Sequence, residues 1–427
     1  MEIINRTESA VRGYCRSFPV VFDKAQGSSL YDVDGREYLD FFSGAGALNY
    51  GHNHPRLKAR LLEYIERDGI THSLDMASWA KERFLERFHS VILAPRGIDY
   101  KIQFPGPTGT NSVEAALKLA RKVTGREKVI SFTNAFHGMT LGALSVTGNA
   151  FKRGGAGVPL TMSDTMPFDG YFGADVDTLE YIERLLADSG SGVDMPAAVI
   201  VETLQAEGGV NVASDEWLRG LQDLCRRHGM LLVVDDIQVG CGRTGPFFSF
   251  EPAGIEPDII CLSKSISGYG LPMALTLIKP EWDQWEAGEH NGTFRGHNPA
   301  FVTATEALSF WESDEFRRAT ETKGVRVREF LDRLAADWPD AFSAVRGRGL
   351  LQGLVCDRDG LAKDISRGAF ERGMVMETAG PEDNVLKLMP PLTIGDEALA
   401  RGLDIVRETV SALLGDSAPA RTIKAAV

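Results

Sequence analysis

The chain alternates short, continuous apolar runs with longer segments in which apolar residues recur every three or four positions. The short runs are rich in β-branched residues, as is typical of strands buried on both faces, and they lie at residues 197–201, 230–234 and 259–262. A further strand is expected at residues 128–132. Between them, segments such as residues 113–120 and 217–224 place apolar side chains on one helical face. This order of strand, helix and strand predicts an α/β fold with a mainly parallel sheet sandwiched by helices.

The pattern changes near residue 313, where charged amphipathic helices and short strands begin. We therefore expect a large domain at residues 56–312 and a smaller α+β domain at residues 313–427, to which an N-terminal segment, residues 1–55, also belongs. Within that segment, Asp34 and Gly35 favour a hairpin between short strands. The Gly- and Pro-rich residues 154–173 are expected to form a long loop.

Two of the apolar runs end abruptly in residues that carry chemistry. Asp235 and Asp236 follow the run at 230–234, and Lys264 follows the run at 259–262. Parallel strands end at one edge of a sheet, where α/β proteins bind ligands. An acid and a lysine there suit pyridoxal phosphate, because the carboxylate keeps the pyridine nitrogen protonated and the lysine forms a Schiff base. Taken singly, each has a simpler explanation, Asp235 as a turn cap and Lys264 as a solvated loop lysine.

Other stretches near this edge could complete a cofactor site. Residues 105–112 form a Gly- and Thr-containing turn that opens a helix, so free backbone N–H groups and the positive helix end would face an anion such as phosphate. The turn lacks the G-K-[ST] element of a P-loop, and helix capping by Asn111 and Glu114 explains the same residues. Phe136 follows a predicted strand and could lie flat on a planar ring, although a core phenylalanine would look the same. Glu202 directly follows the apolar run at 197–201, so it is expected at the same edge of the sheet.

Composition excludes several classes of function. The 427 residues, 43% of them hydrophobic, have a formal charge of -13, which argues against a nucleic-acid surface or a basic face for anionic lipid. We find neither the apolar core of a signal peptide nor a run long enough to span a bilayer. The five cysteines are scattered and lack any C-x-x-C, so we expect no disulfide framework or zinc site, and a cytoplasmic location. The loop histidines His52 and His54 have no third ligand nearby, and no metal is expected.

Residues 240–245 match the G-x-G-x-x-G pattern of dinucleotide-binding folds, but their context is wrong. The dinucleotide fingerprint must open a helix, whereas Pro246 and two phenylalanines follow here. The acid that should end the next strand, Asp258, comes before that strand instead. A nicotinamide-dependent dehydrogenase is therefore only a remote alternative.

Taken together, the motifs resemble those of the class III, or ω-amino-acid, family of pyridoxal phosphate aminotransferases. The resemblance covers nearly the whole chain and implies the type I fold of pyridoxal phosphate transferases. The matching motifs, in chain order, are the N-terminal substrate loop at residues 44–55, the phosphate turn at 109–110, the ring-stacking motif at 136–138, the D-E-V-Q element at 235–238 and the Schiff-base lysine at 264.

The resemblance also assigns expected roles around the cofactor ring. It implies that Asp235 pairs with the pyridine nitrogen, that Gln238 reaches the ring hydroxyl, and that Ile237 packs on the ring face opposite Phe136. Lys264 is the expected catalytic lysine, with Asp235 as its catalytic partner.

The phosphate group has its own expected partners. Gly109 and Thr110 would bind it through backbone and hydroxyl, while Thr293 would reach the phosphate of the neighbouring subunit, so we expect at least a homodimer. Glu202 is expected among the cofactor-binding residues.

Two positions depart from the family pattern. Asp236 stands where the family usually has Glu, and Lys387 stands where an arginine usually grips a substrate α-carboxylate. Lysine offers only a compact charge in place of a two-pronged donor, so this grip is expected to be looser or shared. Our hypothesis is that Glu207 and Lys387 form a switch in which the glutamate masks the cation when an ω-amine substrate enters.

The resemblance leaves the ω-amine substrate open, with ornithine, acetylornithine and γ-aminobutyrate as family examples. A non-catalytic reading, in which the fold serves as a scaffold or regulatory module, would require an empty cofactor site.

Overall fold

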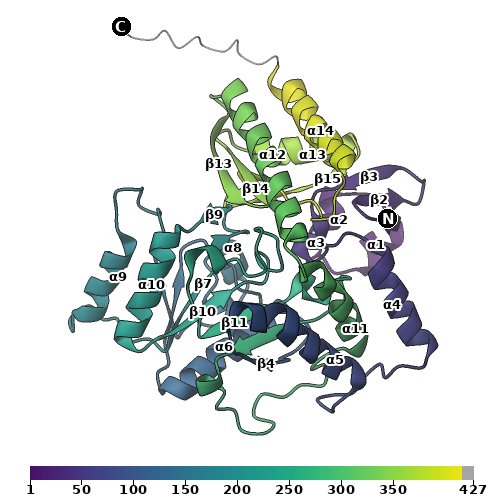
Figure 1. Ribbon diagram of the computed structural model, residues 1–427. Coiled ribbons are helices and arrows are strands. Elements are labelled where there is room, and N and C mark those ends of the chain that lie inside the picture. The colour runs from purple at the N-terminus through teal and green to yellow at the C-terminus, as the bar shows by residue number, and fades with distance from the viewer. Residues whose placement is uncertain (416–427) are drawn as a thin grey trace.

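The computed structural model describes residues 1–415, and the Ala- and Ser-rich residues 416–427 lie outside the described residues. Within the described range, a sheet of seven strands lies at the centre of the larger part of the molecule (Figure 1). The inner strands run parallel, whereas β12 and β4 pair antiparallel at one side. In order across the sheet the strands are β4 (Lys101–Gln103), β12 (Leu275–Ile278), β11 (Ile259–Leu262), β10 (Leu231–Asp235), β7 (Ala198–Val201), β5 (Val129–Phe132) and β6 (Ser163–Met166). The predicted α/β fold is confirmed.

Both faces of this sheet are buried, which explains why its strands are continuous apolar runs. In β10, Leu232 and Val234 belong to one apolar core, and Leu231 and Val233 belong to another. The helices that cover these two faces are α10 (Asp215–His228) for the first core and α6 (Gly109–Thr124) for the second. The alternation of side chains along a strand therefore supplies both cores from one sequence run.

The other helices of the larger part flank this arrangement. Residues 67–78 separate α4 (Pro55–Glu66) from α5 (Trp79–Phe88), and α11 (Asn298–Ala307) packs on both helices. No helix within residues 1–415 is long and apolar enough to cross a membrane. The remaining elements of this part are η1 (His89–Leu93), η2 (Ala94–Arg96), α7 (Leu141–Ser145), α8 (Ala150–Gly154), α9 (Thr178–Ala187), β8 (Leu204–Gln205), β9 (Asn211–Val212), η3 (Glu251–Ala253), η4 (Lys264–Ser267), η5 (Pro280–Trp282) and η6 (Leu308–Trp311).

The expected long loop at residues 154–173 is wrong in one part. It contains β6, which pairs in parallel with β5 and closes one edge of the sheet. Its sequence, Ser163 to Met166, is mostly polar, because an edge strand has only one neighbour and can leave side chains facing solvent. An apolar run is therefore not required there, and the pattern gave no sign of the strand.

A second sheet gathers at the other end of the chain, with helices packed against it (Figure 1). It is antiparallel and has the order β13 (Phe342–Arg348), β14 (Leu351–Cys356), β17 (Val385–Leu388) and β16 (Glu377–Ala379). The helices of this region are α12 (Glu315–Asp337), α13 (Leu361–Glu371) and α14 (Asp396–Leu414).

The N-terminal segment joins this C-terminal region through a sheet of its own. Strand β3 pairs in parallel with β15, so residues far apart in sequence lie side by side. The predicted hairpin is formed by β2 and β3. The domain limits stay a prediction, although this pairing agrees with placing residues 1–55 beside the C-terminal part. The elements here are α1 (Glu2–Thr7), α2 (Tyr14–Ser17), β1 (Phe22–Gln26), β2 (Ser29–Asp32), β3 (Glu37–Asp40), α3 (Ser43–Gly46) and β15 (Met374–Val375).

The G-x-G-x-x-G stretch opens no helix. Residues 240–245 form consecutive turns, and the next helical element is the three-residue η3. Arg243 within the stretch is fully buried, and its guanidinium donates to the carbonyls of Leu350 and Pro390 and to Asn49 Oδ1. The stretch thus ties together segments that are distant in sequence.

Candidate active site

Asp235 is the last residue of β10, at the carboxyl end of the central strand. Its side chain is buried, and Oδ2 lies 2.7 Å from Nδ1 of His137, which is also buried. Burial alone would lower the pKa of His137, but the hydrogen bond and the charge of Asp235 prevail and raise it. The backbone N–H of Ile237 donates to Asp235 Oδ1 at 3.2 Å. These contacts hold the carboxylate in one orientation at the sheet edge.

Lys264 begins the short helix η4, immediately beyond the parallel neighbour of β10. Its φ of +52° lies in the left-handed region that residues with a side chain rarely adopt, and such strain is concentrated at functional sites. The flanking serines fix this backbone: Ser263 Oγ donates to the Met273 carbonyl at 2.8 Å, and Ser265 Oγ to the Gly46 carbonyl at 2.6 Å. The loop that carries Lys264 is thereby fastened to the N-terminal loop.

The charge state of Lys264 follows from its surroundings. Burial lowers the pKa of its ammonium group, and the positive charge of Lys387 adds to this effect, while Glu207 and Asp235 oppose it. A lysine with a lowered pKa is more often neutral, and a neutral amine is both a nucleophile and a base.

The predicted phosphate turn opens α6 as expected. Thr108 and Asn111 form a capping box, so the capping explanation holds for Asn111. It is wrong for Glu114, whose Oε1 accepts from Thr140 Oγ1 and the Ala143 N–H. A Cβ on Gly138 would lie 2.4 Å from Thr110 Oγ1, and one on Gly109 would lie 2.9 Å from Ile237 Cδ1. The two glycines therefore let Thr110 and Ile237 approach closely, forming a cradle at a positive helix end where a phosphate fits.

Phe136 and Glu202 are linked at the end of the sheet. The N–H of Phe136 donates to Glu202 Oε1 at 2.9 Å, and the Lys152 ammonium lies 4.1 Å from the centre of the phenyl ring. Burial raises the pKa of Glu202 to about 7, and the charge of Asp235 adds to this, while His137 opposes it. Glu202 thus positions the backbone of the ring-stacking motif.

Gln238 carries a buried polar atom without a partner. Its Nε2 donates to the Ala45 carbonyl at 2.7 Å, whereas its Oε1 has no hydrogen-bond partner among the described residues. Buried acceptors are normally satisfied, so this oxygen is available to a bound group. The resemblance assigned Gln238 to the ring hydroxyl of the cofactor, which is a donor of the required kind.

Asp236, the first departure from the family pattern, points away from solvent and holds a turn. It is fully buried, and the Ser249 N–H approaches its two carboxylate oxygens at 3.2 and 3.3 Å. Burial raises the pKa of Asp236 to about 7, and the charge of Asp235 adds to this.

Lys387, the second departure, is fully buried on β17 and contacts two carboxylates. Its Nζ lies 2.9 Å from Glu207 Oε1 and 2.8 Å from Glu377 Oε1. Burial would lower the pKa of Lys387, but the two carboxylates raise it above its ordinary value. Burial would raise the pKa of Glu207, but Lys387 and then Lys264 hold it at about 2. The predicted pair of Glu207 and Lys387 is present as an ion pair, although its role as a switch stays a prediction.

Thr293 stands apart from these residues. It lies on an exposed loop, and within residues 1–415 no hydrogen bond joins it to the other predicted site residues. Its expected reach to a neighbouring subunit therefore stays a prediction.

Sequence reasoning missed two participants, His137 and Glu377. The histidine lies in a motif that was chosen for its neighbour Phe136, and its partner Asp235 ends β10, which is separated from β5 by β7 in the sheet. Glu377 faces Lys387 across an antiparallel strand pair, and the register of that pair cannot be read from residue spacing.

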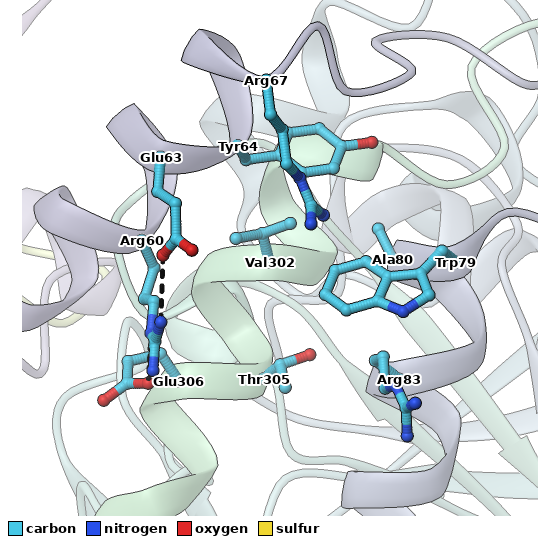
Figure 2. Close-up of a pocket in the computed structure, with 10 residues that line it drawn as sticks. All are labelled: Arg60, Glu63, Tyr64, Arg67, Trp79, Ala80, Arg83, Val302, Thr305 and Glu306. Atoms are coloured by element: carbon cyan, nitrogen blue, oxygen red, sulfur yellow. Dashed lines mark hydrogen bonds and ion pairs between the residues drawn. The ribbon is translucent and has the colours of Figure 1, made fainter.

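A separate groove lies on the outer surface of the helices α4, α5 and α11 (Figure 2). Arg67 stacks over Trp79 at 4.2 Å, and Arg60 pairs with Glu306 at 3.3 Å. The groove contains none of the predicted site residues, so the candidate active site lies elsewhere.

Comparison with known proteins identifies the family of the chain. The model of the class III aminotransferase family matches residues 12–410. A diaminobutyrate–2-oxoglutarate transaminase of Halalkalibacterium halodurans is 59% identical over 414 residues, which cover 97% of each chain. One from Streptomyces anulatus is 60% identical over 414 residues, covering 96% of this chain and 98% of the relative.

The fold has solved relatives as well. An ornithine aminotransferase from Toxoplasma gondii, with pyridoxal phosphate at partial occupancy in its active site, superposes with a TM-score of 0.82 at 28% identity, covering 96% of this chain and 93% of that chain. The phosphate cradle, the free Gln238 oxygen and the acid–lysine pair in the present structure fit the same cofactor. The protein therefore belongs to the class III aminotransferases, and its cofactor is pyridoxal phosphate.

Proposed function

We propose that the protein is an L-2,4-diaminobutyrate:2-oxoglutarate 4-aminotransferase, which moves an amino group from L-glutamate to L-aspartate 4-semialdehyde by a ping-pong reaction. The observation that carries this proposal is the 59% identity, over 97% of both chains, to a relative of that name. The stretches that are similar to this group are residues 106–111, 235–245, 263–270 and 292–298. The proposed reaction is the first step of ectoine biosynthesis, and hence part of osmoadaptation.

Lys264 is the proposed acid–base residue. Bound pyridoxal phosphate supplies a carbon that carries the amino group between the two substrates and a ring that accepts electrons. The lowered pKa of Lys264 makes its Nζ able to take the proton from the substrate carbon that bears the amine, and to return a proton to the corresponding carbon in the reverse half-reaction. The strained backbone and the two bonded serines keep this amine aimed at one point.

Asp235 is proposed to hold a proton on the ring nitrogen. A buried carboxylate stabilises a nearby cation more strongly than an exposed one does, because the surrounding dielectric constant is low. His137 supports this role because its Nδ1 lies 2.7 Å from Asp235 Oδ2. This contact fixes the orientation of the whole carboxylate, including its second oxygen.

Glu207 and Lys387 are proposed to serve the two substrates in turn. With the ion pair closed, Lys387 is masked and an ω-amine substrate can enter without presenting a carboxylate to it. With Glu207 displaced, Lys387 can receive a carboxylate of glutamate or 2-oxoglutarate.

We further propose a homodimer or larger homo-oligomer in the cytoplasm, with no nucleic-acid or membrane partner. The exposed Thr293 loop supports the first part, and the five free cysteines together with the charge of -13 support the rest.

The test is the comparison of kcat/KM for several amines with 2-oxoglutarate as acceptor. We expect L-2,4-diaminobutyrate to exceed ornithine, acetylornithine and γ-aminobutyrate. A higher kcat/KM for ornithine, acetylornithine or γ-aminobutyrate would contradict the proposed substrate but not the family assignment.

The role of Lys264 is tested separately with Lys264→Ala, which we expect to abolish turnover because the substitution removes the amine that takes the proton. Lys58→Ala removes an exposed lysine on α4 and should react as the wild type does. Multiple turnovers by Lys264→Ala would contradict the assignment.

A further inference from the structure

Lys387 is surrounded by more negative charge than one ion pair needs. Its Nζ contacts Glu207 at 2.9 Å and Glu377 at 2.8 Å, and its side chain is fully buried. With both carboxylates ionised, this cluster has a net charge of -1. A buried cation requires a partner, but a second carboxylate beside it carries its own desolvation cost and therefore calls for an explanation.

The two carboxylates differ in how firmly they are held. Glu377 lies on β16 directly opposite Lys387 in the antiparallel pair with β17, and its side chain is 9% exposed. Glu207 lies between β8 and β9, ahead of Gly208 and Gly209, and its side chain is 22% exposed. A turn followed by two glycines can reorient more easily than a paired strand. Glu377 is therefore the fixed partner, and Glu207 is the partner able to leave.

This difference has consequences for a substrate carboxylate. When Glu207 leaves, Glu377 Oε1 still lies 2.8 Å from the Lys387 ammonium, so the exchange never leaves this buried group without a polar neighbour. Whenever Glu377 is ionised, however, it repels the incoming carboxylate, because the two charges have the same sign. A diamine that reacts through its ω-amine, with Glu207 still on Lys387, does not meet this repulsion.

We propose that Glu377 is a specificity-determining positioning residue, which holds Lys387 throughout the cycle and weakens the binding of dicarboxylate substrates relative to the diamine. This inference deepens the proposed function and rests on it for the identity of the diamine. It concerns the strength of carboxylate binding at Lys387, which can be measured without any amine substrate.

The pKa of Glu377 supplies a second readout. Burial raises it to about 7, and Glu207 adds to this, while Lys387 and Lys264 oppose it. The groups that face Glu377 are Lys387 from β17, Glu207 from the β8–β9 turn, Lys264 from η4 through its charge, and the hydroxyl of Tyr14 from α2, 3.4 Å from Oε2. Around neutral pH, Glu377 therefore changes from a neutral carboxylic acid to a carboxylate, which repels a bound dicarboxylate. Dicarboxylate binding should weaken as pH rises.

The experiment measures the dissociation constant of glutarate, an unreactive five-carbon dicarboxylate, by calorimetry on the holoenzyme at pH 6, 7 and 8. If only protein with neutral Glu377 binds well, a group of pKa near 7 makes wild-type binding about tenfold weaker at pH 8 than at pH 6. Glu377→Gln should bind glutarate at pH 8 about tenfold more tightly than the wild type and should lose the pH dependence. Its KM for 2-oxoglutarate should fall, while its KM for diaminobutyrate stays unchanged.

Matched variants separate charge from structure. Glu382→Gln makes the same chemical change at an exposed position between β16 and β17 and should behave as the wild type. Glu377→Asp keeps the charge and should keep the pH dependence, and Glu377→Met serves as the uncharged variant if Glu377→Gln does not fold. Unchanged or weaker glutarate binding in the uncharged variants would overturn the inference. Because glutarate carries no amine, this outcome is independent of which ω-amine proves to be the substrate.

Discussion

Gly138 should determine how tightly the protein holds its cofactor, because it lets Thr110 occupy the phosphate cradle. A Cβ at this position would lie 2.4 Å from Thr110 Oγ1, 2.7 Å from Thr110 Cβ and 3.0 Å from Ala143 Cβ. An ordinary contact between such atoms is about 3.5–4 Å, so Thr110 must move by roughly 1 Å in Gly138→Ala. A displaced hydroxyl loses a hydrogen bond to a charged group, which contributes about 2 kcal/mol, or roughly a thirtyfold change in affinity.

The assay is the titration of the apoprotein with pyridoxal phosphate, followed by absorbance, with the thermal unfolding of the apoprotein measured alongside. Part of the effect of Gly138→Ala comes from its φ of +137°, which strains any side chain. Gly125→Ala provides the control, because Gly125 is the C-cap of α6, the helix that carries Thr110, has a φ of +67° and has no atom within 4 Å of an added Cβ. We expect Gly125→Ala to lose about 1 kcal/mol of stability with unchanged cofactor affinity. Cofactor affinity of Gly138→Ala within twofold of Gly125→Ala would refute the reasoning.

Two further predictions concern the departures from the family pattern. In Asp236→Asn, stability should fall less steeply with rising pH than in the wild type: the folded-state pKa of Asp236, about 7, lies above its unfolded value, so this group contributes stability at low pH that is lost as the pH rises to 7. Between pH 5.5 and 8.5, urea unfolding should show the variant gaining about 2 kcal/mol on the wild type, and equal pH slopes would contradict the assignment. Lys387→Ala should slow the single-turnover reaction with glutamate about tenfold or more, since the carboxylate loses its cation, and should affect the diaminobutyrate reaction less. An unchanged glutamate reaction would remove the proposed switch.

Strands buried on both faces could be predicted from sequence, because side chains on both faces must be apolar and the strand therefore forms a continuous apolar run. Leu231, Leu232, Val233 and Val234 are all apolar because alternate side chains enter different cores. The same pattern placed Asp235 at the sheet edge, since a polar residue follows the last apolar one of the run. Strand β6 was missed because its single neighbour demands little burial.

Contacts set by register or strand direction were not accessible in this way. The antiparallel direction of β12 beside β11 depends on the turn after Lys264, and an apolar run reads the same in either direction. Glu377 meets Lys387 only because β16 and β17 pair in one register, and a shift of one residue would turn the acid to the opposite face. Glu377, the third member of the Lys387 cluster, therefore could not be predicted from the sequence.

The most direct test of the whole account is the visible absorption spectrum of the purified protein, recorded before and after L-2,4-diaminobutyrate is added without any keto acid. The account predicts a yellow protein whose visible band disappears on addition and returns with 2-oxoglutarate, which would establish the cofactor, the lysine and the substrate together. A yellow protein that responds only to another ω-amine would contradict the proposed substrate. A colourless protein that cannot be reconstituted with pyridoxal phosphate would contradict the central claim.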